Sequence, residues 1–304
     1  MISSVVLAPM AGITDKPFRQ MMRLFGNQTL FTEMVGVESL HRNHPVTRKM
    51  MDIREEHNLI VQLVGIKPEA MIYAAQMAED NGAIGVDINM GCPVKKLIAN
   101  GSGAALMKTP DVAARLVESV VSSVSIPVSV KMRIGWDEDH MNAVSFAQTL
   151  ERAGASRLTV HGRTKAQGYA GSAHWDVIGE VKSSVSIPVY ANGDITDRET
   201  ADKALQQTKA NGVMIGRGAL GKPWILQEIE SGIRPEIDRL SLVLRHLDLL
   251  LDYYGSHGIF VARKHIAWYM RGKKGVAEFC QNVYAEKDVK TVKQMITTFL
   301  KGDE

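Results

Sequence analysis

The chain has 304 residues, of which 45% are hydrophobic and 23% are charged, and its formal net charge at pH 7 is +3. This length suffices for one large domain or for a barrel with an appended domain, and the composition is that of an ordinary globular protein. Two distant cysteines give neither a disulfide framework nor a zinc-site spacing, and no apolar run approaches the ~20 residues that cross a membrane, so we expect a cytoplasmic protein without a metal.

Short apolar runs recur along the chain, with helical patterns between most of them. We expect strands at Val5–Ala8, Thr29–Thr32, Leu59–Leu63, Ile84–Ile88, Val128–Met132, Arg157–His161, Val189–Ala191 and Gly212–Ile215. Pro68 and Pro110 stand where first helical turns should begin, and Thr196-Asp197-Arg198-Glu199 has the form of a capping box. Parallel strands alternating with helices predict an α/β protein with a (β/α)8 TIM barrel.

The pattern changes after Pro223-Trp224. From about residue 238 the chain shows helical periodicity and no convincing strand, and the stretch Ser231 to Pro235 has linker-like residues. We therefore expect a barrel domain over residues 1–232 and a small all-helical domain over residues 238–304.

The stretch from Asp87 to Pro93 is the most informative motif. It begins as a buried strand and breaks at Gly91 and Pro93, which leaves Cys92 in a loop just past the carboxyl end of the strand. In a TIM barrel this end is the active-site face. The alternative is that Cys92 is a small buried hydrophobic residue, because free cysteines are usually buried.

Polar or glycine residues also follow the other expected strands. The residues concerned are Pro9 to Gly12, Glu33-Met34, Gln62, Lys131, Arg133, His161 to Arg163, Asn192 to Asp194 and Gly216 to Gly218. Loops after strands seven and eight of such barrels commonly bind a phosphate, which suits Gly193 and Gly216-Arg217. Taken singly, each has an ordinary structural explanation, such as a turn glycine or an ion pair of Lys131 with Asp87 or Glu33.

Several of these stretches together resemble the tRNA-dihydrouridine synthases, most strongly the bacterial B-type members. The resemblance runs from about residue 5 to residue 230. It rests on Leu7 to Asp15, Thr32-Glu33-Met34, Asp87 to Pro93 with Lys95-Lys96, His161 to Thr164, Gln167 to Trp175, Ala191 to Ile195, and Ile215 to Trp224. The segment Leu97 to Gly103 departs from the common pattern.

The resemblance implies a flavoenzyme that reduces uridine in the D-loop of tRNA to 5,6-dihydrouridine, with bound FMN and with NADPH as electron donor. It implies that FMN lies against Pro9, Met10 and Ala11 and is contacted by Gln62, Lys131 and His161. Its phosphate end is expected at Asn192, Gly193, Asp194, Gly216 and Arg217.

The same resemblance makes Cys92 the catalytic acid, which protonates C5 of the uracil after a hydride from the flavin has reached C6. A thiol with a pKa near ~8.5 is still protonated at neutral pH and gives up its proton more readily than an alcohol. Asn89 is expected at the uracil edge. Lys95, Lys96, Arg163 and Lys165 are expected to contact RNA phosphates.

Two alternatives remain open at this stage. One is a different FMN barrel that acts on a small molecule, in the manner of dihydroorotate dehydrogenase. Such an enzyme would need neither basic residues around its active site nor a helical domain after the barrel. The other is an RNA-binding module without catalysis, against which Cys92, Lys131 and His161 argue. The cations Arg263, Lys264, Arg271, Lys273 and Lys274 favour RNA. We expect a monomer.

Overall fold

The computed structural model describes residues 4–302 and contains a parallel sheet of eight strands. The strands are β1 (Val5–Leu7), β2 (Leu30–Gly36), β3 (Leu59–Val64), β4 (Gly85–Met90), β5 (Val128–Arg133), β6 (Arg157–His161), β7 (Val189–Asn192) and β8 (Gly212–Ile215). Each strand pairs with its neighbour in sequence from β2 to β8, and β8 pairs with β1. The N–H of Leu7 donates to the carbonyl of Thr29 at 3.2 Å and nearly closes the barrel. The expected TIM barrel is confirmed.

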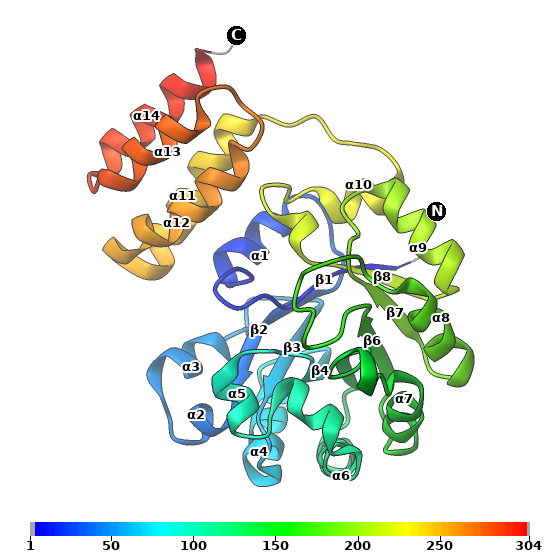
Figure 1. Ribbon diagram of the computed structural model, residues 1–304. Helices are drawn as coiled ribbons and strands as arrows, with labels where there is room; N and C mark the ends of the chain where they lie inside the picture. The colour runs from blue at the N-terminus through cyan, green and yellow to red at the C-terminus, as the bar shows by residue number, and fades with distance from the viewer. Residues whose placement is uncertain (1–3, 303–304) are drawn as a thin grey trace.

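Helices surround the sheet, as Figure 1 shows. They are α1 (Lys16–Arg23), α2 (Val37–His41), α3 (Pro45–Met50), α4 (Pro68–Asp80), α5 (Lys95–Ala99), α6 (Pro110–Val121), α7 (Ala143–Arg152), α8 (Trp175–Ser184), α9 (Arg198–Thr208) and α10 (Ile225–Ser231). Short 3-10 turns occur at η1 (Gly103–Lys108), η2 (Glu138–His140) and η3 (Arg217–Ala219). Pro68 and Pro110 are first helical residues, as predicted.

The capping box before α9 is shifted by one residue from the prediction. The N-cap is Asp197, whose carboxylate accepts a hydrogen bond from the N–H of Thr200 at 2.8 Å. The hydroxyl of Thr200 in turn accepts from the N–H of Asp197. Glu199 instead forms an ion pair with Lys203 at 2.6 Å. The carboxylate of Asp197 is the stronger acceptor, so the helix begins after it rather than after Thr196.

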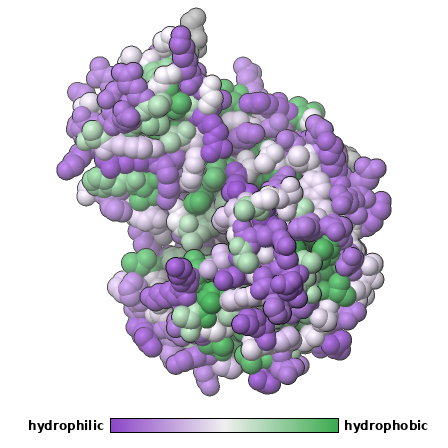
Figure 2. Space-filling view, viewed as in Figure 1, coloured by the Kyte–Doolittle hydropathy of each residue, from purple (hydrophilic) through white to green (hydrophobic). Residues whose placement is uncertain are grey.

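The last part of the chain is helical and has an apolar cluster of its own. It consists of α11 (Arg239–Tyr254), η4 (Gly255–His257), α12 (Gly258–Tyr269), α13 (Val276–Ala285) and α14 (Val289–Lys301), and we call it the helical domain. Leu247, Ile266 and Val292 are among the buried residues that join these helices, and Cys280 packs against them. Residues 233–238 form no regular element. Figure 2 shows this domain as a lobe beside the rounded barrel.

The helical domain contacts the barrel near β1 and β2. The hydroxyl of Tyr254 donates to the carboxylate of Asp15 at 3.0 Å, and Lys264 donates to the carbonyl of Gly12. The ammonium of Lys49 lies 3.8 Å from the centre of the Tyr253 ring. The domain therefore stands beside the carboxyl end of β1. Within residues 4–302, no helix is long and apolar enough to cross a membrane.

Candidate active site

The carboxyl ends of the strands meet at one face of the barrel, which we call the mouth. Its β3–β5 side is built on a buried carboxyl group. Asp87 is inaccessible to solvent and accepts hydrogen bonds from the hydroxyl of Ser129 at 2.6 Å and from the amide of Gln62 at 2.7 Å. Burial raises the pKa of Asp87. The other end of the Gln62 amide accepts from Asn89 at 2.8 Å, so the network reaches the end of β4.

Asn89 fixes the loop that carries Cys92. Its side-chain oxygen accepts from the N–H groups of Gly91 at 3.1 Å and Cys92 at 2.9 Å. The carbonyl of Cys92 accepts from the N–H of Ala104 at 3.0 Å. Gly103 has φ +61°, and a Cβ there would lie 2.7 Å from the Cys92 carbonyl oxygen, so only glycine fits. The loop is thus held from two sides.

The environment of Cys92 keeps its thiol protonated. Burial raises the thiol pKa above its usual value, and a hydrogen bond from the backbone of Val94 and the cations Arg133 and Lys131 oppose this rise without cancelling it. A protonated thiol at neutral pH is suited to donate a proton and unsuited to act as a nucleophile.

Arg133 ties this loop to the loop between β6 and α8. It is 3% exposed, and its guanidinium donates to the carbonyls of Gly91 at 2.8 Å, Thr164 at 2.9 Å and Gly168 at 3.0 Å. Its charge is therefore buried beside Cys92 and has only carbonyl oxygens as acceptors among these contacts.

Lys131 reaches across the mouth from β5 to β7. Its ammonium donates to the side-chain oxygen of Asn192 at 2.9 Å, and the Asn192 amide donates to the carbonyl of Met214 in β8 at 2.8 Å. The ion pair with Asp87 or Glu33 that the sequence left open is not among the interactions of the described residues. Burial, together with the nearby charge of Arg133, lowers the pKa of Lys131 to about 8.

His161 lies at the end of β6 among cations. Burial and the charges of Lys131, Arg133, Arg163 and Arg217 lower its pKa to about 2. The imidazole is therefore neutral at physiological pH and binds as a neutral donor or acceptor. It therefore does not act as a cationic general acid at neutral pH.

The loops after β7 and β8 contain glycines, which add no side-chain bulk of their own. Gly193 has φ +119°, and a Cβ there would lie 2.8 Å from the Cβ of Ala173. At Gly216 an added Cβ would meet only Ala8 and Met10, at 3.7 and 3.9 Å, which leaves ordinary space. Arg217 begins η3, and its side chain is 53% exposed and 3.5 Å from the carboxylate of Asp194. Glycine backbone beside an accessible guanidinium is suited to a phosphate.

Arg163 has a different environment from the one expected for a phosphate contact. Its guanidinium is 2% exposed and donates to both carboxylate oxygens of Asp194, at 2.8 and 2.7 Å, and to the carbonyl of Ala170 at 3.0 Å. The guanidinium therefore offers no exposed N–H group to an RNA phosphate. Asp194 likewise has its carboxylate committed to Arg163, so any contribution to anion binding comes from its backbone.

The remaining predicted residues lie at the rim. Pro9 and Met10 are partly exposed and Ala11 is exposed after β1. The next N–H, that of Gly12, donates to the carboxylate of Glu33. Lys95 and Lys96 begin α5 and are exposed, three and four residues after Cys92.

Tyr169 is a residue of the mouth to which the sequence argument gave no role. It is 60% exposed, and its ring centre lies 4.7 Å from the guanidinium carbon of Arg217, 6.0 Å from that of Arg133 and 6.2 Å from the His161 ring. The sequence feature that could have indicated this role is an aromatic residue in a loop between Gly168 and Gly171. The ring covers the charged side of the mouth.

The mouth fits an anionic, partly planar cofactor such as FMN. Lys131, Arg133 and Arg217 converge on it, and among residues 4–302 Asp194 is the one carboxylate that forms an ion pair with any of these three cations. Gln62, Asn192 and His161 add neutral polar groups. Among these same residues no cluster of three or more His, Cys, Asp or Glu side chains is arranged to hold a metal ion.

Comparisons with known proteins show the family to which the chain is similar. Residues 6–302 match the family described as dihydrouridine synthase. A probable tRNA-dihydrouridine synthase of Rickettsia conorii is 42% identical over 98% of this chain and 93% of its own length. The tRNA-dihydrouridine synthase B of Pseudomonas aeruginosa is 40% identical over 90% of this chain and 86% of its own. The structure of histamine dehydrogenase from Rhizobium sp. 4-9 superposes with a TM-score of 0.58 at 13% identity, over 81% of this chain and 48% of that one, and supports the fold alone.

Proposed function

The chain belongs to the dihydrouridine synthase family, and from that premise we propose that it reduces uridine in the D-loop of tRNA to 5,6-dihydrouridine, with FMN bound at the mouth and NADPH as the electron donor. The observation that supports this most is the juxtaposition of a protonated Cys92 thiol with a cationic site across one barrel mouth. Membership of this family sets aside the small-molecule FMN barrel that the sequence had left open.

We propose that FMN lies along the β6–β8 side of the mouth. Its phosphate end would be bound by Arg217 and by the backbone of Asn192, Gly193, Asp194 and Gly216, because φ +119° at Gly193 and φ +55° at Asp194 turn the chain there in a way that ordinary strands do not. Pro9, Met10 and Ala11 would contact the ring system from β1. Lys131 would stabilise negative charge on the ring. The neutral His161 would add a polar contact, and Gln62 would add one through the amide hydrogen that Asp87 does not bind. When bound, FMN supplies the hydride for C6 of the uracil.

We propose that Cys92 donates the proton to C5. The thiol is partly buried, its pKa is raised, and the Asn89 clamp fixes its backbone, so the proton is present at neutral pH and held in one place. Asn89 itself has its oxygen committed to Gly91 and Cys92 and one amide hydrogen committed to Gln62. It would therefore act chiefly by positioning Cys92, with one remaining N–H for the uracil edge.

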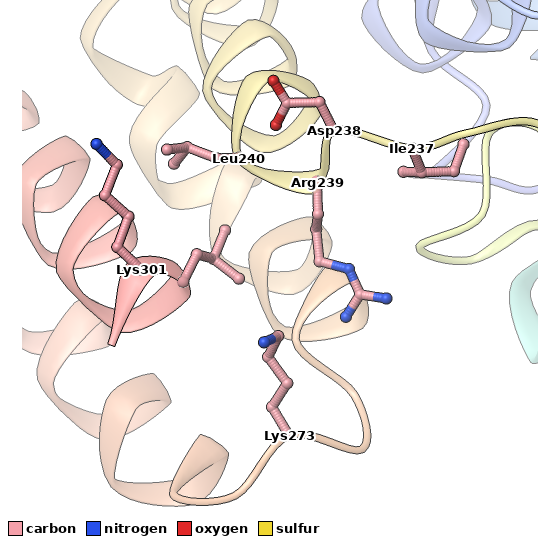
Figure 3. A pocket seen from close by; sticks show the side chains of 7 residues that line it. Ile237, Asp238, Arg239, Leu240, Lys273 and Lys301 are labelled. Atoms are coloured by element: carbon pink, nitrogen blue, oxygen red, sulfur yellow. The ribbon is translucent and has the colours of Figure 1, made fainter. Parts of the chain in front are cut away.

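We propose that residues 238–304 bind tRNA. A pocket of about 710 Å3 lies between the start of α11 and the ends of α12 and α14, and its charged lining residues are Arg239, Lys273, Lys301 and the single carboxylate Asp238 (Figure 3). In Figure 3 the side chains of Arg239 and Lys273 extend toward each other. Phosphate oxygens are the ligands that such a cationic cluster favours.

The other cations of residues 238–304 that the sequence singled out divide into two groups. Arg263 donates to the carbonyl of Glu286 and packs on Phe260, and Lys264 donates to Gly12, so both support the protein. Arg271 and Lys274 are exposed. Together with Lys95 and Lys96 they remain available to RNA.

The direct test is to incubate the purified enzyme with NADPH and an unmodified tRNA transcript and to map dihydrouridine in the product. We expect a flavin absorption spectrum that bleaches with NADPH and a product confined to the D-loop. A colourless protein, or a flavoprotein that leaves the tRNA unchanged, contradicts the proposal. Replacing NADPH by NADH in parallel measures the preference for the donor.

A further inference from the structure

A second cationic site, centred on Trp136, lies at the rim of the mouth on the side away from the helical domain. The loop after β5 turns back on itself, with a bridge between Gly135 and Met141 and a hydrogen bond from the N–H of Trp136 to the carbonyl of His140 at 3.1 Å. A Cβ at Gly135 would lie 2.5 Å from that carbonyl oxygen, so the tight crossing requires glycine. The Trp136 ring in this turn is partly exposed.

Two ammonium groups lie over the Trp136 ring. That of Lys108 is 4.6 Å from the ring centre and that of Lys165 is 4.2 Å from it. Within residues 4–302 neither lysine forms an ion pair with a carboxylate. Of the acidic groups in the turn, Asp137 accepts from His140 at 2.6 Å, and Glu138 and Asp139 are exposed. Two like charges beside one ring, with no counter-ion, are stabilised by an added anion.

A pocket adjoins this cluster. It has a volume of about 430 Å3 and is lined by Lys108, Trp136, His140, Asn142 and the neighbouring Met107, Pro110, Asp137 and Met141. Its walls are fixed, because the amide of Asn142 donates to the carbonyl of Met107 at 2.8 Å and the N–H of Ala166 donates to the carbonyl of Trp136 at 2.8 Å. Pockets of this size accept a ligand as large as a nucleotide.

The place of the pocket in the fold relates it to the proposed reaction. Lys108 ends η1, the turn whose Ala104 N–H holds the carbonyl of Cys92. In a ring of eight strands β5 is opposite β1, and the helical domain contacts the barrel beside β1. A chain that passes from the helical domain over the mouth therefore meets the Trp136 turn on the far side.

We propose that this pocket binds a tRNA nucleotide close in sequence to the target uridine. Its base would replace one of the two ammonium groups on the Trp136 indole, and its phosphate would be bound by Lys108 and by Lys165 at the edge of the pocket. The proposal rests on the proposed function. Stacking on an aromatic ring is open to any base, and the two ammonium groups pair with the phosphate without reading sequence. The pocket thus holds the strand while the target base is turned out into the mouth.

The test uses the FMN-loaded enzyme, unmodified tRNA and the variants Trp136→Ala, Trp136→Phe, Lys108→Gln and Lys165→Gln. We expect Trp136→Ala to weaken tRNA binding about 5- to 100-fold, the range for one stacked base. Trp136→Phe keeps a ring and should lose much less. Each lysine variant should weaken binding at low salt and reduce the slope of log K against log salt by about 0.7–0.9.

Two further readouts exclude a merely structural effect. Tryptophan fluorescence of the parent should be quenched by tRNA, and the quenched component should be missing in Trp136→Phe. Lys182→Gln, in the last turn of α8 at the opposite face of the barrel, is the matched control and should bind tRNA as the parent does. The rate of flavin reduction by NADPH should be unchanged in every variant.

Parental tRNA affinity and salt slope in all four variants would overturn the inference while the parent still forms dihydrouridine. A weakened NADPH reduction with unchanged tRNA affinity would assign the pocket to the dinucleotide and equally overturn it. If the parent itself neither binds tRNA nor forms dihydrouridine, the proposed function fails, and this inference fails with it.

Discussion

The two sides of the barrel mouth are stabilised by different forces. On the β3–β5 side, Asp87, Gln62, Ser129 and Asn89 form a buried chain of hydrogen bonds that is complete within the protein. On the β6–β8 side, a neutral His161 is surrounded by cations, namely Lys131 and Arg133, which reach over from β5, and Arg163 and Arg217. The carboxylate among them, that of Asp194, is already bound by Arg163. The first side needs no ligand to keep its shape, whereas the second contains more cations than carboxylates.

This difference indicates which side of the mouth serves catalysis and which side binds the cofactor. A buried hydrogen-bond network holds a reacting group in place, and here it ends at the Cys92 loop. An excess of buried positive charge stabilises an anion once that anion is bound. Changes on the first side should therefore affect catalysis with the cofactor retained, and changes on the second should affect cofactor binding.

The largest effect is expected for Cys92→Ala. Loss of a positioned acid should slow dihydrouridine formation by about 10²–10⁴-fold, with normal flavin content. Cys280→Ala is the matched control, because that thiol packs against the helical domain, and it should keep nearly parental turnover. The measurement is the initial rate of dihydrouridine formation at saturating NADPH. Equal losses in both variants would mean that the effect is structural.

Asn89→Ala should be the next largest. It removes the acceptor for two N–H groups of the Cys92 loop and a hydrogen bond to Gln62. A displacement of the thiol by about 1 Å would cost roughly 10²-fold in turnover, while FMN stays bound. Turnover and flavin content of the same preparation give the answer. Loss of flavin together with turnover would show that the two sides are not separate.

Arg217→Ala tests the charged side. A charge-assisted contact to the FMN phosphate is worth about 1.5–3 kcal/mol, so retention of FMN should fall by roughly 10- to 100-fold while the fold is kept. Equilibrium dialysis measures the affinity for FMN, and the unfolding temperature of the cofactor-free protein shows whether the fold is kept. Arg152→Ala, at the end of α7, is a control with the same change of charge. Parental FMN affinity in Arg217→Ala would remove Arg217 from the phosphate site.

The smallest effect concerns the stability of the cofactor-free protein at alkaline pH. Because the pKa of Lys131 is lowered to about 8 in the folded protein from its usual 10.5, the unfolded chain binds more protons between these values. The free energy of unfolding should therefore rise with pH from about 8 to 10.5, and the thermal midpoint with it by about 5 °C. Lys131→Met should abolish this rise.

Bound FMN should weaken the pH dependence of stability that Lys131 causes. An anion beside Lys131 raises the pKa of the ammonium again, so the rise in stability should shrink in the loaded enzyme. A rise of the same size with and without FMN would place the cofactor away from Lys131.

The strand order and the strand ends could be read from the sequence because they follow from local patterns. Apolar runs of three to five residues predicted the strands to within a few residues, and polar residues after each run predicted the mouth. The family resemblance, drawn from motifs such as the stretch Asp87 to Pro93, is confirmed by the match over residues 6–302.

Other features depend on contacts between distant residues, which no local pattern contains. The burial of Arg163 follows from Asp194, 31 residues later, and the place of Lys131 follows from Asn192, 61 residues later. Tyr169 takes part in the mouth because Arg217 and Arg133 converge on its ring. The capping residue of α9 was misplaced by one position because two acceptors, Thr196 and Asp197, compete there.

The division between the two sides of the mouth is tested most directly by timing the two half-reactions separately in Cys92→Ala under anaerobic conditions. Reduction of the bound flavin by NADPH requires no proton donor at the uracil, so its rate should match that of the parent. Reoxidation of the reduced enzyme by unmodified tRNA in a single turnover should be slowed by about 10²–10⁴-fold. Reoxidation at the parental rate would contradict the account, because Cys92 would then not be the acid that its network holds in place.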